Sequence, residues 1–506
     1  MSPTTRDIDH DQDDEAMSPS SVNLDHVEWQ LLEESDSSDL DDSDPQALIA
    51  GHDLATAPLM TRDGFLATAN GKHATQYGVL GKVLAIHSPN GKEVLEDKRL
   101  YINTNAPFSA IVCGVQGSGK SHTVATILEN MLIPKFPAIG TLAKPLVGLV
   151  LHYGEGGASC LPSEAAWLSS SISSHVSGVP VCVYVSHSSL HTMKAVYSCF
   201  GDAKITVEPL YFKNTELDAA AILSMMAVGS SESAPLYMQI ILSILRDLGE
   251  KFTFAAFMSQ LNISKQKFNP AQLASLEQRM TLLNAFLEPE VSYGLSGQKK
   301  RTKRGSLFAP GQLTIVDLSD PFLDEASACG LFEIIVRLFI RADIGTGKVL
   351  VVDEAHKYLS CQRTTTGLTK SLLNVIRQQR HLAIRVIIST QEPTVVPSVL
   401  LDLCSVTIIH RFSSPTWWQH LIQHVPTDFS GRDVFDQVVK LQTGHAIILA
   451  PSGIGLFSEP ANLSAESLSS SQDGKVLSRF GRRYLIMKTR KRVTADGGAS
   501  VLVLED

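Results

Sequence analysis

Residues 114–121 have the sequence GVQGSGKS, which fits the phosphate-binding loop pattern G-x-x-x-x-G-K-[ST] at every specified position. The apolar run at 108–113 has the length of a strand, and the sequence directly after the loop can begin a helix. The loop therefore has the strand-to-helix context that its chemistry requires. Gly114, Gly117 and Gly119 allow the tight bend that aims backbone N–H groups at phosphate oxygens.

Two side chains at the end of this loop carry further chemistry. Lys120 can reach the β and γ phosphates, and the Ser121 hydroxyl can bind a magnesium ion. The alternative is a glycine-rich turn with a lysine present by chance. The residues expected to bind the nucleotide are Gly114, Val115, Gln116, Gly117, Ser118, Gly119, Lys120, Ser121 and His122.

An acidic pair follows a second apolar run, in KVLVVDEAHKYL at 348–359. Four apolar residues come directly before Asp353 and Glu354. They predict a buried strand with two carboxylates at its end. A phosphate-binding loop needs such a partner, in which Asp353 holds magnesium through water and Glu354 deprotonates the attacking water. The alternative is an ordinary helix N-terminus with acidic capping.

Three further polar residues belong to the stretch RQQRHLAIRVIISTQEP at 377–393. Gln391 follows a predicted strand at 385–389, where it is well placed to sense the γ-phosphate or its water. Arg377 and Arg380 end the preceding predicted helix. They either cap that helix, since cations favour a helix C-terminus, or supply an arginine to the nucleotide of a neighbouring subunit.

Charge is distributed unevenly along the 506 residues. Residues 1–50 contain fifteen Asp and Glu and one basic residue, Arg6, so their net charge is −14. The whole chain carries −9, so the other 456 residues carry +5. The acidic composition predicts disorder at 1–48, either as a solubilising tail or as an arm that docks a partner through the apolar group at 29–32.

Cysteine spacing and hydropathy indicate the compartment. The seven cysteines form no C-x-x-C pair, which favours a reducing, intracellular location and argues against a zinc site built from cysteines. No secretory signal and no membrane-spanning stretch are expected. Basic residues at 299–304 indicate a solvated loop, a nuclear-import signal or a nucleic-acid contact, so the interpretation leans towards the nucleus over the cytoplasm.

Apolar strands that alternate with helices predict an α/β fold with a mostly parallel sheet covered on both faces. Residues 49–105 suggest a small β-rich element, with Asn90-Gly91 at a hairpin. A helical insertion is expected at about 214–300, within a core spanning 106–455. Residues 456–506 are polar and then basic, and they suggest a flexible tail.

Trp417 and Trp418 suggest core packing or stacking on nucleic-acid bases.

The order of these motifs resembles the HerA/FtsK superfamily of translocase ATPases, and HerA-like proteins most closely. The resemblance covers about residues 105–455 and depends on GVQGSGKSH, the insertion, LTIVDLS, VLVVDEAH, RQQRH and STQEP. It implies a RecA-like P-loop NTPase that binds ATP and Mg²⁺, forms a homo-hexameric ring and moves DNA, with a possible nuclease or adaptor partner. By resemblance Lys120 and Ser121 are the phosphate-loop pair, Asp353 and Glu354 the acids, Gln391 the sensor, and Arg380 or Arg377 the arginine finger.

Two other functions remain open. The residues DEAH at 353–356 suggest a superfamily 2 helicase, although Lys120 and Asp353 are 233 positions apart, too far for the compact first domain of that family. A non-motor switch or scaffold that binds ATP and scarcely hydrolyses it is the other alternative. Glu354 and Gln391 argue against it, since a pure switch needs neither residue.

Overall fold

The structure is a computed structural model that describes residues 51–67, 76–88, 91–93, 95–157, 159–172, 175–201, 203–226, 236–289, 306–359, 367–425, 432–458 and 475–498. The predicted acidic tail at 1–48 and the basic loop at 299–304 lie outside the described residues. Within the described ranges, no helix combines the length and the apolar character needed to cross a membrane.

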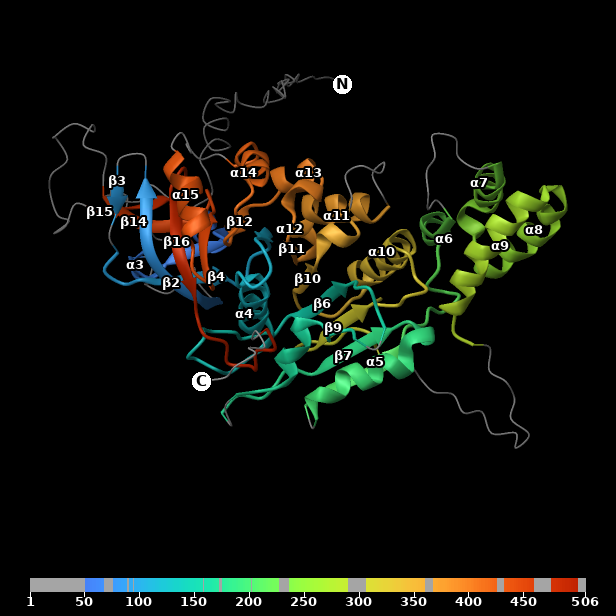
Figure 1. Ribbon diagram of the computed structural model, residues 1–506, viewed down its shortest axis with the longest axis horizontal. Coiled ribbons are helices and arrows are strands. Elements are labelled where there is room, and N and C mark those ends of the chain that lie inside the picture. The colour runs from blue at the N-terminus through green and yellow to red at the C-terminus, as the bar shows by residue number, and fades with distance from the viewer. Residues whose placement is uncertain are drawn as a thin grey trace, which may run out of the picture.

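Eight strands form the parallel part of a single sheet (Figure 1). Within this part every strand pairs in parallel with the next, which confirms the predicted α/β class. In spatial order the strands are β12 (Val406–Ile409), β5 (Ser109–Cys113), β11 (Ile384–Thr390), β10 (Lys348–Val352), β6 (Val147–His152), β9 (Leu313–Asp317), β7 (Val181–Val185) and β8 (Ile205–Pro209).

Strand β10 shows how both faces of this sheet are buried. Val349 and Val351 join one core, and Leu350 and Val352 join the other, because successive side chains of a strand point to opposite faces. The first core includes residues of α4 (Lys120–Leu132), the short 3-10 helix η1 (Glu164–Ser169) and α5 (Leu190–Val196). The second includes residues of α10 (Glu325–Arg341) and α11 (Gly367–Arg377). A parallel sheet needs such cover on both faces.

Four helices form the predicted insertion, at the right-hand end of Figure 1. Three were expected from their apolar spacing, namely α6 (Ala219–Met226), α7 (Leu236–Leu248) and α9 (Pro270–Ala285). The structure adds α8 (Phe254–Ser264), which begins where the Thr253 hydroxyl accepts a hydrogen bond from the Ala256 N–H at 3.2 Å. Helix α6 packs against α10, so the insertion is joined to the second core of the sheet.

A mostly antiparallel extension continues the sheet beyond β12, at the left of Figure 1. Its strands, in spatial order, are β13 (His445–Leu449), β16 (Tyr484–Thr489), β2 (Tyr77–Ser88), β4 (Arg99–Asn103), β1 (Leu59–Thr61), β14 (Ile454–Ser458) and β15 (Lys475–Arg479). Strand β3 (Gly91–Glu93) pairs antiparallel with β2, with Gly91 opposite Ser88, whereas Asn90 of the predicted hairpin lies outside the described residues. The β-rich element expected at 49–105 is therefore continuous with the nucleotide core, because β16 lies between β2 and β13.

The prediction of a flexible tail after residue 456 is wrong for residues 475–498. These residues contain β15 and β16, and β16 is an interior strand of the sheet. Their basic side chains pair with acids far away in the sequence: Arg479 with Asp53, Arg483 with Glu93 and Arg490 with Glu129. Because a composition pattern holds no information about such partners, it suggested a solvated basic cluster.

Trp417 and Trp418 lie in α14 (Pro415–Ile422). The Trp418 side chain is buried and lies 6.0 Å, between ring centroids, from Phe435 in α15 (Arg432–Lys440). Trp417 contacts Phe412 with 5.8 Å between ring centroids. These contacts favour the packing interpretation. Short helices elsewhere are α2 (Gly51–Thr56), α3 (Arg62–Ala67), α12 (Gln379–Leu382) and α13 (Ser398–Asp402).

Glu129 on α4 binds the segment that follows β16 and so connects this segment to α4. Its carboxylate is fully buried and accepts a hydrogen bond from Arg490 Nη1 at 2.6 Å. The other oxygen accepts bonds from the backbone N–H of Val493 and Thr494, at 3.0 and 2.9 Å, and from the Thr494 hydroxyl at 2.7 Å. The buried Arg492 guanidinium lies 3.9 Å away. A carboxylate with this many donors is stable in a buried position.

Replacing Glu129 with alanine is expected to lower the free energy of unfolding by about 3–5 kcal/mol, since the largely buried Arg490 and the buried Arg492 would lose the carboxylate between them. Urea unfolding of the full chain measures the change. The matched control is Glu277→Ala, which removes an exposed carboxylate 3.8 Å from Lys265 and should cost less than about 1 kcal/mol. Equal losses for the two variants would show that Glu129 does not anchor this segment.

Candidate nucleotide site

The phosphate loop joins the end of β5 to the start of α4, as expected from its sequence. Gly114, Gly117 and Gly119 have positive φ angles of 150°, 71° and 109°. Two of them also allow close contacts: a Cβ at residue 114 would lie 2.7 Å from Cβ of His410, and a Cβ at residue 119 would lie 2.8 Å from the Gly444 nitrogen. At these two positions the loop conformation therefore depends on glycine.

Buried polar side chains hold the phosphate loop and the first turn of α4 in place through hydrogen bonds. His410 Nδ1 lies 2.9 Å from the His445 carbonyl oxygen, and its Nε2 lies 3.1 Å from Thr123 Oγ1 on α4. Burial lowers the pKa of His410 to about 3, so the imidazole is neutral at any working pH. Thr123 Oγ1 also lies 2.8 Å from Thr489 Oγ1 at the end of β16. Strands β12 and β16 thus both contact the first turn of α4.

Lys120 is buried at the start of α4 and donates a hydrogen bond from Nζ to the Val115 carbonyl oxygen at 3.2 Å. Burial lowers the pKa of its amine, while the negative charges of Glu354 and Asp353 act in the opposite direction. The tertiary structure therefore brings the loop lysine and the acidic pair into one site, although they are more than 230 positions apart in the sequence.

The strand register explains how these segments meet. Cys113 of β5 pairs with Thr390 of β11, and Val352 of β10 pairs with Ile388 of β11. The residues that follow these strands are Gly114, Gln391 and Asp353. All three therefore lie at the carboxyl edge of the parallel sheet, where ligands of open α/β sheets bind.

Asp353 is held by a histidine that the sequence analysis did not identify. Its Oδ2 lies 3.4 Å from Nδ1 of His152, the last residue of β6. Burial alone would raise the pKa of Asp353, but the hydrogen bond and charge of His152 lower it overall. For His152, burial acts to lower the pKa, and the charges of Asp317 and Asp353 raise it overall. Asp353 is therefore held as a carboxylate.

Glu354 has a backbone conformation that is unusual for a residue with a side chain. Its φ and ψ are 49° and 41°, in the left-handed region, and such strain is common where a side chain must be aimed for function. The Glu354 Oε2 accepts a hydrogen bond from Gln391 Nε2 at 2.9 Å and lies 3.4 Å from His356 Nε2. The two residues expected to position and deprotonate water are thus in direct contact.

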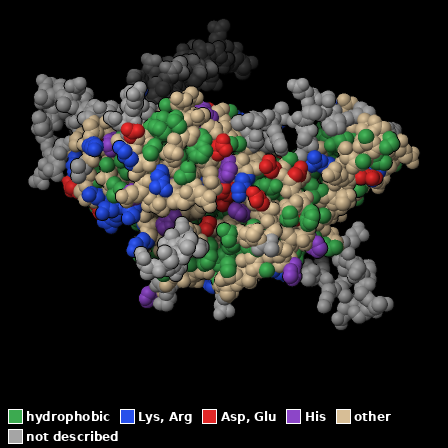
Figure 2. Space-filling view, viewed as in Figure 1, with side chains coloured by type: hydrophobic (Ala, Val, Ile, Leu, Met, Phe, Trp, Pro, Cys, Tyr) green, Lys and Arg blue, Asp and Glu red, His purple; other side chains and the backbone are tan. Residues whose placement is uncertain are grey.

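Oxygen ligands suitable for magnesium are present beside the loop. Ser121 is half-buried in the first turn of α4, and the Asp353 carboxylate is 15% exposed. Among the described residues, no group of three or more His, Cys, Asp or Glu side chains could hold a metal ion. The Ser121 and Asp353 oxygens would suit Mg²⁺, which usually takes one or two protein oxygens together with phosphate and water oxygens. Figure 2 shows Asp, Glu and His side chains gathered in the middle of one face of the molecule.

Arg377 and Arg380 do not reach the loop of their own chain. Both are exposed and lie before β11, whereas Gln391 lies after it. The seven residues of β11 place roughly 20 Å between these two ends. Arg380 instead lines a pocket of about 410 Å³ at the opposite edge of the sheet, together with His52, Asp53, Gln379, Ser405 and Arg479. Supply of an arginine to a neighbouring subunit remains a prediction.

Three histidines of this site were missed from the sequence. His152 ends an apolar strand, and His356 follows the acidic pair, so their positions after strands were available as a signal. His410 also follows an apolar strand, but only its buried position shows that it supports the loop. A polar residue directly after a buried parallel strand is a candidate for the ligand edge of the sheet.

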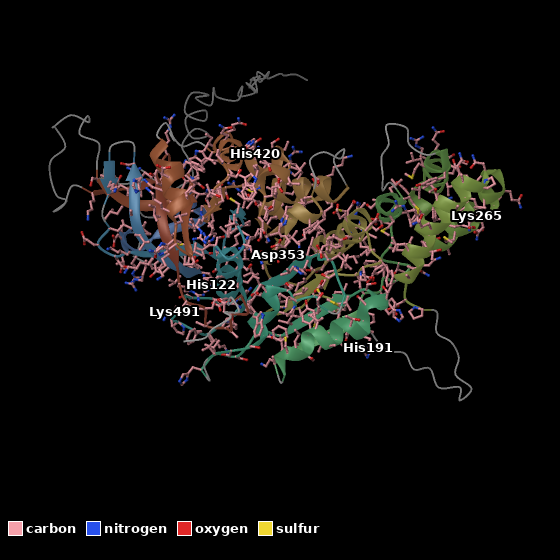
Figure 3. All side chains as sticks on the ribbon, in the orientation of Figure 1. His122, His191, Lys265, Asp353, His420 and Lys491 are labelled. Carbon is pink, nitrogen blue, oxygen red and sulfur yellow. The ribbon has the colours of Figure 1, made fainter. Side chains whose placement is uncertain are left out.

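The fold and the site together define a class of protein. A phosphate loop between β5 and α4, an acidic pair after β10, and a mostly parallel sheet covered by helices on both faces constitute the RecA-like P-loop NTPase fold. This confirms the predicted fold class. Figure 3 labels Asp353 near the middle of the molecule, and it also labels His122, which lies in the first turn of α4.

No protein-family model matches the chain, and no curated protein matches it. Among solved structures, the chain is similar to VirB4 of Thermoanaerobacter pseudethanolicus, with 13% identity over 74% of this chain and 93% of VirB4 and a TM-score of 0.36. It is also similar to the bacterial conjugative coupling protein TrwBΔN70, with 11% identity over 77% of this chain and 88% of that one and a TM-score of 0.36.

A third similarity is to the genome packaging NTPase B204 of Sulfolobus turreted icosahedral virus 2, in complex with ATP-γ-S. It has 18% identity over 27% of this chain and a TM-score of 0.22, and this chain spans 61% of B204. All three TM-scores are too low to define a fold by similarity. The fold is therefore defined by the strand order and the loop of this chain itself.

Proposed function

We propose that this protein is a magnesium-dependent ATPase. The contact that supports this most directly is the 2.9 Å hydrogen bond between Gln391 and Glu354, at the sheet edge that also carries the phosphate loop. A protein that only binds nucleotide needs the loop, but it needs neither a carboxylate base nor an amide aimed at the same water.

Each residue of the proposed site has a separate role in ATP hydrolysis. The backbone N–H groups of residues 114–121 bind the phosphates, and the Lys120 ammonium neutralises charge on the β and γ phosphates. Ser121 and Asp353 would hold magnesium, which stabilises the charge that develops on the phosphate oxygens. Glu354 accepts the proton of the attacking water, and Gln391 orients that water.

We further propose that the ATPase core at 106–455 works in a HerA/FtsK-like ring, most simply a hexamer, that moves DNA. The order of motifs along the chain supports this, as does the exposure of Arg377 and Arg380 at the edge opposite the loop. In a head-to-tail ring one surface of each subunit meets a different surface of the next. An arginine at one edge can then serve the nucleotide held at the other edge of a neighbour. A nuclease or adaptor would act with the ring, inside the cell where ATP is available.

ATP turnover by the full chain tests this function. We expect steady-state hydrolysis that requires Mg²⁺ and rises several-fold with double-stranded DNA, from a particle of six times the monomer mass in the presence of a non-hydrolysable ATP analogue. Heparin is the control polyanion, because charge attraction alone would make it equally effective. If the protein hydrolyses ATP as a monomer and DNA does not raise the rate, the motor function is excluded and the ATPase activity stands. Stable ATP binding without turnover would favour the non-motor switch.

A further inference from the structure

Residues 490–498 run along α4, from Glu129 near its C-terminal end to His122 in its first turn, directly after the phosphate loop. His122 is the residue directly after Ser121, and both of its ring nitrogens contact this segment. Nδ1 lies 2.8 Å from Asp496 Oδ2, and Nε2 lies 2.8 Å from the carbonyl oxygen of Arg490. In Figure 3, His122 lies between the labels of Lys491 and Asp353. The 490–498 segment is therefore adjacent to the proposed nucleotide site.

The direction of a bound nucleotide follows from the sheet order. Strands β11 and β10 lie on one side of β5 and carry Gln391, Asp353 and Glu354, so the γ-phosphate belongs on that side. The nucleoside must then leave the loop away from these residues. Successive side chains on a helix point about 100° apart, so His122 faces a different direction from Ser121, and it faces the 490–498 segment.

Asp496 presents a carboxylate at this position. Its side chain is 42% exposed, and its Oδ2 contacts His122. Its Oδ1 lies 3.7 Å from Arg492 Nη1 and accepts a hydrogen bond from the Gly498 N–H at 3.1 Å. A carboxylate has about four acceptor positions, so the exposed side of Asp496 can accept bonds from a ligand. A carboxylate repels phosphate but matches the two adjacent hydroxyl donors of a ribose, a pairing that other nucleotide-binding folds use.

Contacts on both sides fix the position of Asp496. On one side, Val493 and Thr494 are bonded to the buried Glu129. On the other side, Gly497 lies so close to Trp167 that a Cβ at this residue would collide with the indole ring. The carboxylate is therefore held in place before any ligand binds, which reduces the entropic cost of binding.

We propose that Asp496, positioned by His122, accepts hydrogen bonds from the ribose hydroxyls of the bound nucleoside triphosphate. The 490–498 segment is thus part of the nucleotide site, and it adds specificity for a ribonucleoside to a loop that binds only phosphate. This inference rests on the proposed ATP binding at residues 114–121.

Affinity measurements with three ligands test the inference on the full chain. The ligands are ATP, 2′,3′-dideoxy-ATP and inorganic tripolyphosphate, each with Mg²⁺. The wild-type protein should bind ATP about tenfold or more tightly than dideoxy-ATP, because a hydrogen bond to a charged group contributes about that much. Asp496→Ala should bind ATP and dideoxy-ATP equally, and it should bind tripolyphosphate as the wild type does.

The matched control is Asp402→Ala, which removes another exposed aspartate in contact with a histidine, His424, at 2.7 Å. This variant should keep the wild-type preference for ATP. The inference is overturned if Asp496→Ala retains that preference, or if it weakens ATP and tripolyphosphate by the same factor, since Asp496 would then only support the loop. A wild-type protein that binds none of the three ligands would overturn the proposed function as well. Equal unfolding temperatures of the variants exclude a loss of fold.

Discussion

Replacing Lys120 with alanine is expected to lower ATP turnover by about 100- to 1000-fold, the effect of removing one preorganised charge donor from a transition state. Lys120 is buried beside Asp353 and Glu354, and its Nζ donates to a loop carbonyl oxygen at 3.2 Å. No other lysine lies at this end of α4. The variant leaves two carboxylates facing the phosphates without their cation, so ATP affinity should fall as well.

Turnover and ATP affinity are measured together for this variant, with Lys82→Ala as the control. Lys82 is an exposed lysine on β2, in the antiparallel extension, and its removal should change neither quantity. Wild-type turnover by Lys120→Ala would contradict the assignment of residues 114–121 as the phosphate site. An unchanged unfolding temperature would separate loss of function from loss of fold.

Replacing Glu354 with glutamine is expected to lower turnover by about 100- to 10,000-fold while ATP stays bound. The side chains have the same shape, so the left-handed backbone at φ 49° and the contact with Gln391 can persist. The amide cannot accept the proton of the attacking water at neutral pH. The reaction therefore stops after binding, and the protein should retain unhydrolysed ATP.

The readout is the nucleotide that remains bound after a single turnover, together with the rate of phosphate release. Glu208→Gln on the exposed surface of β8 is the control and should hydrolyse ATP as the wild type does. Hydrolysis at the wild-type rate by Glu354→Gln would remove Glu354 from its role as the base. Loss of ATP binding would instead indicate that this carboxylate positions magnesium.

Local patterns predicted much of the parallel core. The loop at 114–121 carries its own conformational requirements, because its glycines adopt positive φ angles wherever the chain must bend around phosphate. The apolar runs that became β5, β6, β9, β10 and β11 are recognisable because a strand buried on both faces is apolar at nearly every position. These signals lie within a few neighbouring residues.

Prediction from local sequence patterns failed in the C-terminal region. Residues 475–498 were expected to be a flexible tail, yet β16 pairs with β13 and β2, and Arg490 contacts a glutamate 361 positions earlier. Seven basic residues within a short stretch indicate a solvated cluster if their partners are unknown. The burial of the Arg490 and Arg492 guanidinium groups is favourable because Glu129 is buried beside both of them.

By itself, the sequence determined the chemistry available to this protein: a phosphate loop with its lysine, two carboxylates after a buried strand, and a glutamine after another. Only the tertiary structure decided which of these groups meet. The register of β5, β11 and β10 brings Lys120, Glu354 and Gln391 to one edge and leaves Arg380 at the other. The same structure places Asp496 against His122. The physical reason is that a motif depends on neighbours in the chain, whereas a contact between residues hundreds of positions apart depends on how the whole sheet is ordered.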